Sequence, residues 1–227
     1  MPQAEAGTAA APASGPQQPR FDLSAAPAML HTPRLRLEAP RPDHAEAFAA
    51  GVAASMASLT YVAWGLRPRS IDWARRFCED DASSLAAGED LAFHVFALAD
   101  GAWVGRIDVH SNDFVACRGE IGYVGHQRHA GQGLMREAVL AVIDLCFILG
   151  YERIEAMSDA RNARALHFAE ALGLQREGVL RHHERGPQGQ LCDMVLYATL
   201  RPARDEQCHD RGAGQNLRPL PPLPPAR

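Results

Sequence analysis

The segment GEIGYVGHQRHAGQGLMREAVLAVIDLCFILG, residues 119–150, joins a strand-like run to a helix-like run through a loop that contains glycines. The part EIGYVG predicts a short strand. Apolar residues recur after the loop at helical spacing, which predicts a helix with one buried face, closed by Gly150: Leu134, Ala138, Ala141, Val142 and Leu145. Gly131 and Gly133 lie where this helix should begin, so the backbone there is expected to approach a partner closely.

A glycine-containing helix start is chemically suited to an anion. The first N–H groups of a helix lack intrahelical partners and carry a partial positive charge, and phosphate is their usual ligand. The string Arg-x-x-Gly-x-Gly also fits a plain tight turn. The Gly-x-Gly-x-x-Gly of dinucleotide folds and the GK[ST] of P-loops are both absent from the segment. The loop therefore favours another kind of nucleotide carrier.

The rest of the chain alternates short strands with helices. RLRLEAP predicts a first strand that breaks at Pro40, and Pro42 stands at a helix-start position before DHAEAFAAGVAASM. A second helix is expected after Ser70, and LAFHVFALA and AWVGRIDVH flank the turn pair Asp100-Gly101 as a β-hairpin. A strand is then predicted over RIEAMS, a helix over NARALHFAEAL and a late strand over QLCDMVLYATL. This order predicts an α/β (α+β) domain around one mixed sheet.

The length of 227 residues is enough for one domain with a sizeable core and short for two. Residues 1–28 are rich in Ala, Pro, Gly, Ser and Gln and are predicted to form an unstructured tail. The stretch 202–227 is rich in proline and is expected to be an extended tail, with an SH3-type ligand as the alternative. The folded domain is therefore predicted over residues 31–201.

The formal net charge of −4 gives no broad electrostatic reason to expect nucleic acid or an anionic membrane as partner. The chain has no run approaching the ~18 apolar residues of a membrane span, and its start does not have the pattern of a signal peptide. The 5 cysteines include no CxxC pair, which favours reduced thiols. We expect a cytoplasmic protein.

Four segments carry a family resemblance: HTPRLRLEAPRPDHAEAFA, GEIGYVGHQRHAGQGLMREAV, ERIEAMSDARNARALHFAEALGLQREGVLR and GQLCDMVLYATL. In this order and spacing they resemble the GNAT family of acetyl-coenzyme A-dependent N-acetyltransferases. They are most similar to the group that contains the ribosomal-protein-alanine N-acetyltransferases RimJ and RimL. The resemblance spans residues 31–201. It implies a GNAT-type fold, a single mixed and mostly antiparallel sheet flanked by helices, with acetyl-coenzyme A as cosubstrate.

The resemblance also implies where the coenzyme lies. Backbone N–H groups of the glycine loop would hold its pyrophosphate: Arg128, His129, Ala130, Gly131, Gln132 and Gly133. Tyr123, Val124 and Gly125 would run beside the pantetheine arm, on a strand that splays from its neighbour. Asn162 would help to hold the cofactor, although it is equally well placed as a helix N-cap. Phe168 would pack near the thiol end, with ordinary core packing as the alternative.

Acetyl transfer to an amine needs a neutral amine, a polarised thioester carbonyl and a way to protonate the leaving thiolate. An N–H near Val124 is the implied donor to the carbonyl. The resemblance places the general base at Glu184, in EGVLRHHE, and Glu120 is the second candidate, acting directly or through water. Relatives carry a serine three residues after the asparagine, but Ala165 stands there and cannot donate a proton. Water, Tyr123 or Ser158 are the possible substitutes.

The acceptor is a primary amine, with a protein N-terminal α-amine favoured over a small amine by overall likeness alone. Tyr61 and Trp64 are candidates for an apolar wall of the acceptor cleft, and the acidic run Glu79-Asp80-Asp81 could attract a cationic amine or simply be solvated. Two alternatives stay open. One is an acyl-coenzyme A-binding module without turnover, and the other is a different donor such as succinyl-coenzyme A, served by Arg164 or Arg181.

The histidine-containing stretches RHHE and GHQRHAG could suggest a metal site. Neither has His pairs at helical i, i+4 spacing or a third ligand at a known spacing, so we expect surface histidines and no metal. The resemblance also makes a homodimer plausible, with no interface that the sequence identifies.

Overall fold

The computed structural model describes residues 21–62 and 70–203. Its strands form one 8-stranded sheet in the order β1-β2-β3-β4-β5-β6-β8-β7. The strands are β1 (Met29–His31), β2 (Leu35–Glu38), β3 (Leu91–Ala97), β4 (Trp103–Asp113), β5 (Arg118–Gly125), β6 (Arg153–Asp159), β7 (Gln175–Arg185) and β8 (Leu191–Leu200). The α-helices are α1 (Ala45–Ser55), α2 (Ile71–Ala87), α3 (Leu134–Leu149) and α4 (Ala163–Ala171). The predicted mixed, mostly antiparallel sheet is confirmed.

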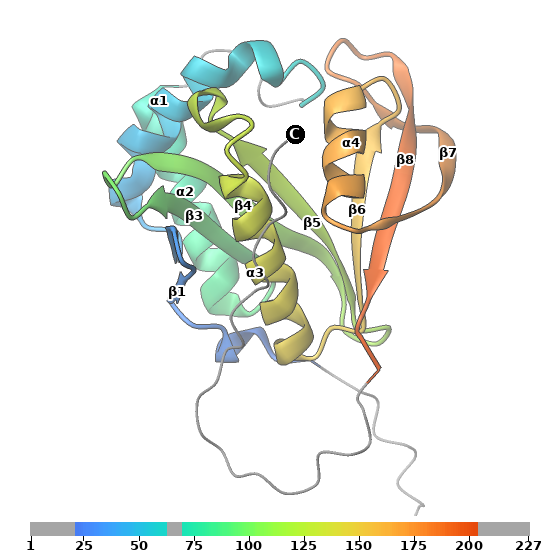
Figure 1. The fold of residues 1–227 in the computed structure, drawn as a ribbon, viewed down its shortest axis with the longest axis horizontal. Coiled ribbons are helices and arrows are strands. Elements are labelled where there is room, and N and C mark those ends of the chain that lie inside the picture. Colours follow the sequence, from blue (N-terminus) through green and yellow to red (C-terminus); the bar gives the residue numbers. More distant parts are fainter. Residues whose placement is uncertain (1–20, 63–69, 204–227) are drawn as a thin grey trace, which may run out of the picture.

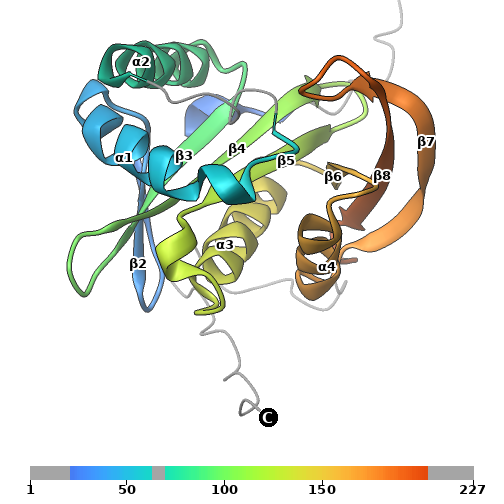
Figure 2. The same ribbon diagram turned by 90° about the horizontal axis from the view of Figure 1, so that it is seen from above.

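The helices cover both faces of the sheet. Helices α1 and α2 lie on one face, and α3 and α4 lie on the other, as Figures 1 and 2 show. Ser70 caps the start of α2 by accepting a hydrogen bond from the Trp73 N–H, as a helix beginning after Ser70 requires. Gly88 ends this helix in the left-handed conformation, at φ +69°. The predicted hairpin forms between β3 and β4.

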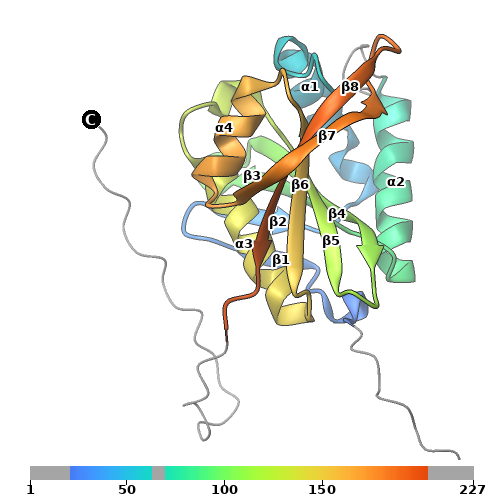
Figure 3. The same cartoon turned by 90° about the vertical axis from the view of Figure 1, so that its right-hand side faces the viewer.

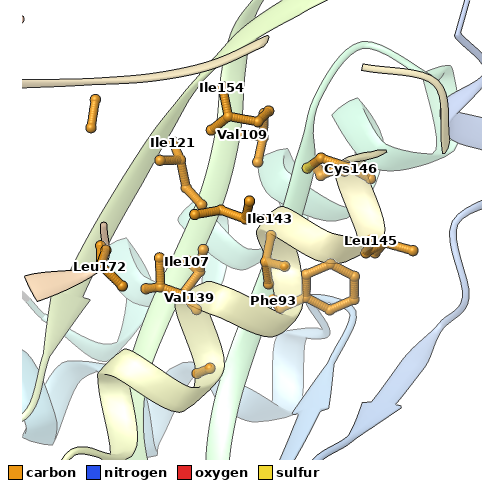
Figure 4. Close-up of a cluster of buried hydrophobic side chains, with 14 of the residues drawn as sticks. Phe93, Ile107, Val109, Ile121, Val139, Ile143, Leu145, Cys146, Ile154 and Leu172 are labelled. Carbon is orange, nitrogen blue, oxygen red and sulfur yellow. The ribbon is translucent and has the colours of Figure 1, made fainter. Parts of the chain in front are cut away.

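Two apolar cores result from this layering. The larger one packs α3 against the sheet, and Figure 4 shows the side chains of Val139 and Ile143 lying among Phe93, Ile107 and Ile121. The second core lies under α1 and α2 and contains these buried aromatic and apolar side chains: Phe48, Val52, Ala74, Phe96 and Trp103. The central strands are therefore covered by apolar side chains on both faces.

The predicted unstructured tail over residues 1–28 is too long, because the folded part already includes residues 21–28. Phe21 is 4% exposed and Leu23 is 2% exposed, and both belong to the larger core. The ring of Phe21 stacks on those of Phe114 and Tyr151, with centroids 4.5 and 3.9 Å apart. Two apolar side chains thus suffice to anchor a segment whose composition resembles that of the tail. The predicted tails over 1–20 and 204–227 lie outside the described residues.

Strands β5 and β6 run parallel but separate. They pair at only three positions, Arg118 with Arg153, Gly119 with Ile154 and Glu120 with Glu155. Beyond Glu120, β5 continues along β4 and β6 continues along β8, and Figure 1 shows the two strands diverging. The splay implied by the resemblance is therefore present. One edge of β5 is left without a strand partner over the residues that follow Glu120.

Strand β7 is, with the short edge strand β1, one of the two strands that the sequence did not predict. Its side chains are exposed along most of its length, so it lacks the alternation that predicts a strand. It pairs antiparallel with β8, and Figure 3 shows the two as a twisted ribbon beside β6. The register shifts between Leu180, which faces Met194, and Glu184, which faces Cys192. This bulge changes the direction in which the end of β7 presents its side chains.

Candidate active site

A cleft of about 420 Å³ lies where β5 and β6 separate. Strands β4, β5 and β6, helices α2 and α4, and Val62 contribute to its wall. The lining residues are Val62, Phe77, Arg106, Asp108, His110, Glu120, Ile121, Gly122, Tyr123, Val124, Met157, Ser158, Asn162 and Ala165. The lining combines an apolar part with carboxylates, a guanidinium and an imidazole, which is a composition suited to positioning a polar ligand.

The glycine loop adopts the conformation that its glycines allow. Gly131 and Gly133 have φ +77° and +74°, in the left-handed region where side chains other than hydrogen are disfavoured. Gly133 caps α3, whose first intrahelical hydrogen bond runs from the Glu137 N–H to the Gly133 carbonyl, 3.0 Å. The N–H groups of the helical residues before Glu137 therefore have no partner within the helix. Such a helix terminus, here following the loop after β5, is chemically suited to an anion.

Hydrogen bonds within the glycine loop already occupy several of the N–H groups that could bind a phosphate. Within the loop, the N–H groups of Arg128, His129, Ala130 and Gln132 donate to His126 Nδ1, His126 O, Gln127 O and His129 O respectively. Among the described residues, no acceptor is found for the N–H groups of Gly131 and Gly133. Of the residues 128–133, which the resemblance implies as a pyrophosphate site, Gly131 and Gly133 are thus the two whose N–H groups stay available for a ligand.

An arginine that the sequence reading did not single out fixes the loop. Arg34 Nη1 donates to the Gln132 carbonyl, 3.0 Å, and its Nε donates to Glu137 in the first turn of α3, 2.6 Å. Thr32 Oγ1 also donates to Glu137, 2.5 Å. Because the C=O and N–H of a trans peptide point in opposite directions, holding the Gln132 carbonyl turns the Gly133 N–H away from Arg34.

Where β6 has separated from β5, every second residue of β5 directs its backbone N–H and C=O groups away from β4. The His126 N–H donates to the Val104 carbonyl, 2.8 Å, and the β4–β5 pairing continues from there without a shift to Val124. Hydrogen-bonded residues recur at every second position of an antiparallel pair, so the backbone N–H and C=O groups of Val124 are directed to β4. The N–H and C=O groups of Tyr123 and Gly125 are directed to the side where β6 has left. The register therefore favours these two neighbours over Val124 as donors to a ligand.

Helix α4 forms the opposite side of the cleft. Asn162 caps it, accepting a hydrogen bond from the Ala165 N–H at 3.2 Å, and both residues line the cleft. Phe168 packs edge-to-face against Tyr123, with ring centroids 5.0 Å apart. Burial raises the pKa of the Tyr123 hydroxyl to about 12, so it stays protonated at neutral pH. Ser158 is the other hydroxyl that lines the cleft.

A row of alternating charges crosses the floor of the cleft. Arg106 donates two hydrogen bonds to Asp81 of α2, both 2.7 Å, and a third to Asp108. His110 Nδ1 lies 2.7 Å from Asp108 Oδ2, and its Nε2 lies 4.0 Å from Glu120 Oε1. Burial raises the pKa of Asp81, whereas Arg106 and His110 outweigh burial at Asp108 and lower its pKa. The hydrogen bond that the His110 ring donates to Asp108 raises the pKa of His110.

Glu120 lies at the end of this row, where β5 and β6 part. Its side chain is 17% exposed and lines the cleft. Burial raises the pKa of its carboxyl, His110 opposes that effect, and the charges of Glu184, Glu155 and Asp108 reinforce it. A carboxylate with a raised pKa, held in a cleft, has the properties of a general base.

Glu184 is exposed near the end of β7, next to the bulge. It is not among the residues that line the cleft, but its charge acts on Glu120. The bulge is held by Asp193, whose carboxylate accepts a hydrogen bond from the His182 N–H at 2.8 Å. His182 has φ +52°, an uncommon conformation for a residue with a side chain. The two candidate bases thus lie on different elements and differ in burial.

The candidates for the acceptor wall are only partly described. Tyr61 is 37% exposed, with the Arg161 guanidinium 5.5 Å from its ring centroid, while Trp64 lies outside the described residues. Of the acidic run, Glu79 and Asp80 are exposed, and Asp81 binds Arg106. In the described part of the chain, no group of three or more His, Cys, Asp or Glu side chains is arranged to hold a metal ion.

The sequence reading missed Arg106, Asp108 and His110, although they leave a signal. They stand at every second position of the buried hairpin strand AWVGRIDVH, and alternate residues of a strand share a face. Polar side chains repeated on one face of an otherwise apolar strand must find partners there. Arg34 leaves no comparable signal, because its partners are distant in the sequence.

The chain matches the family described as acetyltransferase (GNAT) domain over residues 34–175. A probable N-acetyltransferase of Bacillus subtilis, YjcK, is 31% identical over 153 residues, which cover 65% of this chain and 77% of YjcK. An uncharacterized N-acetyltransferase of Bacillus licheniformis, p20, is 36% identical over 85 residues, 37% of this chain and 47% of p20. These matches show that the protein is an acyltransferase. The chain belongs to the GNAT acetyltransferase family.

Solved structures share the fold at lower identity. The microcin C7 self-immunity acetyltransferase MccE, solved with acetyl-coenzyme A and AMP, is 19% identical, with a TM-score of 0.71 over 79% of this chain and 99% of that one. RimL, the ribosomal L7/L12 α-N-protein acetyltransferase, solved with coenzyme A, is 18% identical, with a TM-score of 0.70 over 76% of this chain and 97% of that one. The predicted GNAT-type fold is confirmed.

Proposed function

We propose that this protein transfers the acetyl group of acetyl-coenzyme A to a primary amine, with a protein N-terminal α-amine as the favoured acceptor. The observation that carries the proposal is the cleft between β5 and β6. Strand β5, which lines the cleft, leads into a helix N-terminus with free amides, and a mostly buried carboxylate, Glu120, lies in the cleft. RimL, which shares the fold, acts on a protein α-amine, and that supports the choice of acceptor.

The chain's own residues then divide the chemistry. The amides of Gly131, Gly133 and the first turn of α3 bind the coenzyme pyrophosphate, and the edge of β5 binds the pantetheine arm and polarises the thioester carbonyl. Glu120 removes a proton from the acceptor ammonium, which frees the nitrogen lone pair for attack. Tyr123 stays protonated and donates a hydrogen bond to the departing sulfur, in the role that Ala165 cannot fill.

Glu184 remains the second candidate for the base. Its exposure is compatible with a role at the mouth of the cleft, where it adds negative charge beside Glu120 and attracts an ammonium group. Arg164 is less suited to binding a second carboxylate of the acyl donor, because its Nη1 already donates to Ser58 and Gln127, both at 3.0 Å. We therefore propose an acetyl donor.

The test is release of free coenzyme A thiol by the full chain with acetyl-coenzyme A, across peptides with different N-termini, polyamines and aminoglycosides. Mass spectrometry of the acceptor should show one added acetyl group on an amine. Turnover with an N-terminal peptide supports the whole proposal, and turnover with a small amine alone changes the acceptor. Binding of acetyl-coenzyme A without thiol release for any amine contradicts it and favours a binding module, consistent with Ala165.

We also propose a cytoplasmic location. The described cysteines are all free and buried, as expected of a reducing compartment. No helix in the described ranges is long and apolar enough to cross a membrane.

Pairing into a homodimer is a further part of the proposal, to be measured by light scattering.

A further inference from the structure

Three side chains of β4 share the face that borders the cleft: Arg106, Asp108 and His110. Asp108 lies between the other two, bonded to Arg106 through one oxygen and 2.7 Å from His110 Nδ1 through the other. Arg106 is itself held by the bidentate contact with Asp81. The imidazole of His110 is therefore fixed by a chain of charge-assisted hydrogen bonds that begins on another element.

The sequence makes room for this arrangement opposite Asp108. The β4–β5 register pairs Asp108 with Gly122, and a Cβ added at Gly122 would lie 3.0 Å from Asp108 Oδ1. A side chain at Gly122 would crowd the carboxylate that holds His110. In the same register His110 faces Glu120 directly, so the two side chains come from paired positions of adjacent strands.

His110 connects Glu120 with solvent. Its Nε2 lies 4.0 Å from Glu120 Oε1, within ion-pair distance and longer than a hydrogen bond, so one bridging water can link the two groups. The His110 side chain is 39% exposed, whereas that of Glu120 is 17% exposed. A proton taken up by Glu120 in the cleft thus has an adjacent acceptor that is itself accessible to water.

We propose that His110 is the proton-relay residue of this acyltransferase: it accepts from Glu120 the proton that leaves the acceptor ammonium, and it passes that proton to solvent while Asp108 holds its ring. The inference rests on the proposed function. In this scheme His110 acts on the acceptor only through Glu120, so it is a positioning residue and not a catalytic one.

The protons balance in this scheme. The acceptor enters as an ammonium and loses one proton to Glu120, which passes it to His110 Nε2 and then to water. The free amine forms the new C–N bond as the C–S bond of the thioester breaks. The second proton lost by the nitrogen ends on the sulfur, which leaves as the free thiol. One proton is released to solvent per turnover, and Glu120 is again a carboxylate.

The surrounding charges support the direction of transfer. Asp108 on β4, Glu120 on β5 and Asp90 before β3 all raise the pKa of His110, and burial opposes them. These charges favour a proton on the imidazole, whose ordinary pKa already lies above that of a carboxyl group. Arg106 is neutralised by Asp81 and Asp108, so its charge does not cancel this effect.

The test compares wild type with His110→Gln, His110→Ala and Asp108→Asn, in thiol release over a range of pH. We expect kcat to fall about 10-fold or more in both His110 variants, with KM for acetyl-coenzyme A unchanged. The wild-type rate should rise with pH through the raised pKa of His110, and this inflection should be absent from His110→Gln. Imidazole added to His110→Ala should restore rate in proportion to its concentration. His31→Gln, an exposed histidine on the edge strand β1, is the matched control.

Unchanged kcat in the His110 variants overturns the inference. So does a loss of rate that leaves the pH profile unchanged and that imidazole does not restore, because that result assigns His110 a structural role alone. Thermal unfolding of each variant separates a folding defect from either result, and Asp108→Asn keeps the shape of the side chain. If wild type itself releases no thiol, the proposed function fails instead, and the two failures are thereby distinguished.

Discussion

At the scale of single residues, the site depends on two carboxylates with different surroundings. Glu120 lies in the cleft with a pKa raised by burial, and Glu184 lies exposed on a bulged strand. Family resemblance pointed to Glu184, and the position of Glu120 on the splayed strand made it the second candidate. Burial could not be read from the sequence, because it depends on where β5 leaves β6.

Glu120→Gln should make the protein more stable while making it less active. A raised pKa means that the folded state favours the protonated carboxyl, so folding is opposed increasingly as pH rises through that pKa. A neutral glutamine avoids this cost. The unfolding temperature of the variant should exceed that of wild type at pH 7, and the difference should shrink toward pH 4. An unfolding temperature lower than that of wild type at pH 7 would contradict the account of Glu120 burial.

Gly133→Ala should weaken coenzyme binding as well as stability. The residue has φ +74°, where an alanine costs about 1 kcal/mol, and its N–H is a proposed phosphate donor. We expect KM for acetyl-coenzyme A to rise about 10-fold. Gly88→Ala is the matched control, since Gly88 has φ +69° with nothing near its Cβ position and ends α2. Equal effects of both changes on KM would argue against a role for the loop amides.

At the scale of secondary-structure elements, hydrophobic periodicity predicted the long buried pieces. The helix after the glycine loop, the β3–β4 hairpin and the strand β6 were all identified from their patterns. Strand β7 and the short edge strand β1 were not, because their side chains are mostly exposed and leave no pattern. The splay came only with the family resemblance, since no local signal marks the point at which two strands stop pairing.

The contact between the β1–β2 turn and the start of α3 should set the affinity for the coenzyme. Arg34→Ala removes the hydrogen bond to the Gln132 carbonyl and the pair with Glu137, and so releases the Gly133 peptide. We expect KM for acetyl-coenzyme A to rise about 10-fold with little change in kcat. Arg75→Ala, an exposed arginine on α2, is the control for loss of charge. Unchanged KM in Arg34→Ala would show that the loop holds its shape alone.

At the scale of the whole molecule, stability and chemistry reside at opposite ends of α3. The glycine loop lies at the start of the helix, and the N-terminal segment packs at its end, where the Phe21 Cβ lies 3.0 Å from a Cβ position built at Gly150. Composition predicted one domain with tails and could not detect that Phe21 and Leu23 anchor the chain. Two apolar residues in a run of small and polar ones are a weak signal.

Phe21→Ala should therefore destabilise the fold without changing the chemistry. Phe21 is 4% exposed and stacks on two rings, so its loss should cost about 3 kcal/mol of unfolding free energy. Urea unfolding measures this cost, and kcat at a temperature where both proteins are folded should be unchanged. Val115→Ala, at a position that is 56% exposed, should be nearly neutral. A change in kcat with Phe21→Ala would show that the two ends of α3 are coupled.

The most direct test of the central claim is the rate of thiol release from acetyl-coenzyme A by wild type, Glu120→Gln and Glu184→Gln, with one accepted amine over a range of pH. The account predicts that Glu120→Gln lowers kcat about 100-fold, leaves KM for acetyl-coenzyme A unchanged and removes the rise of rate with pH. It predicts a smaller effect of Glu184→Gln, mainly on KM for the amine. Full activity in Glu120→Gln together with a loss of that size in Glu184→Gln would contradict the account and move the base to β7.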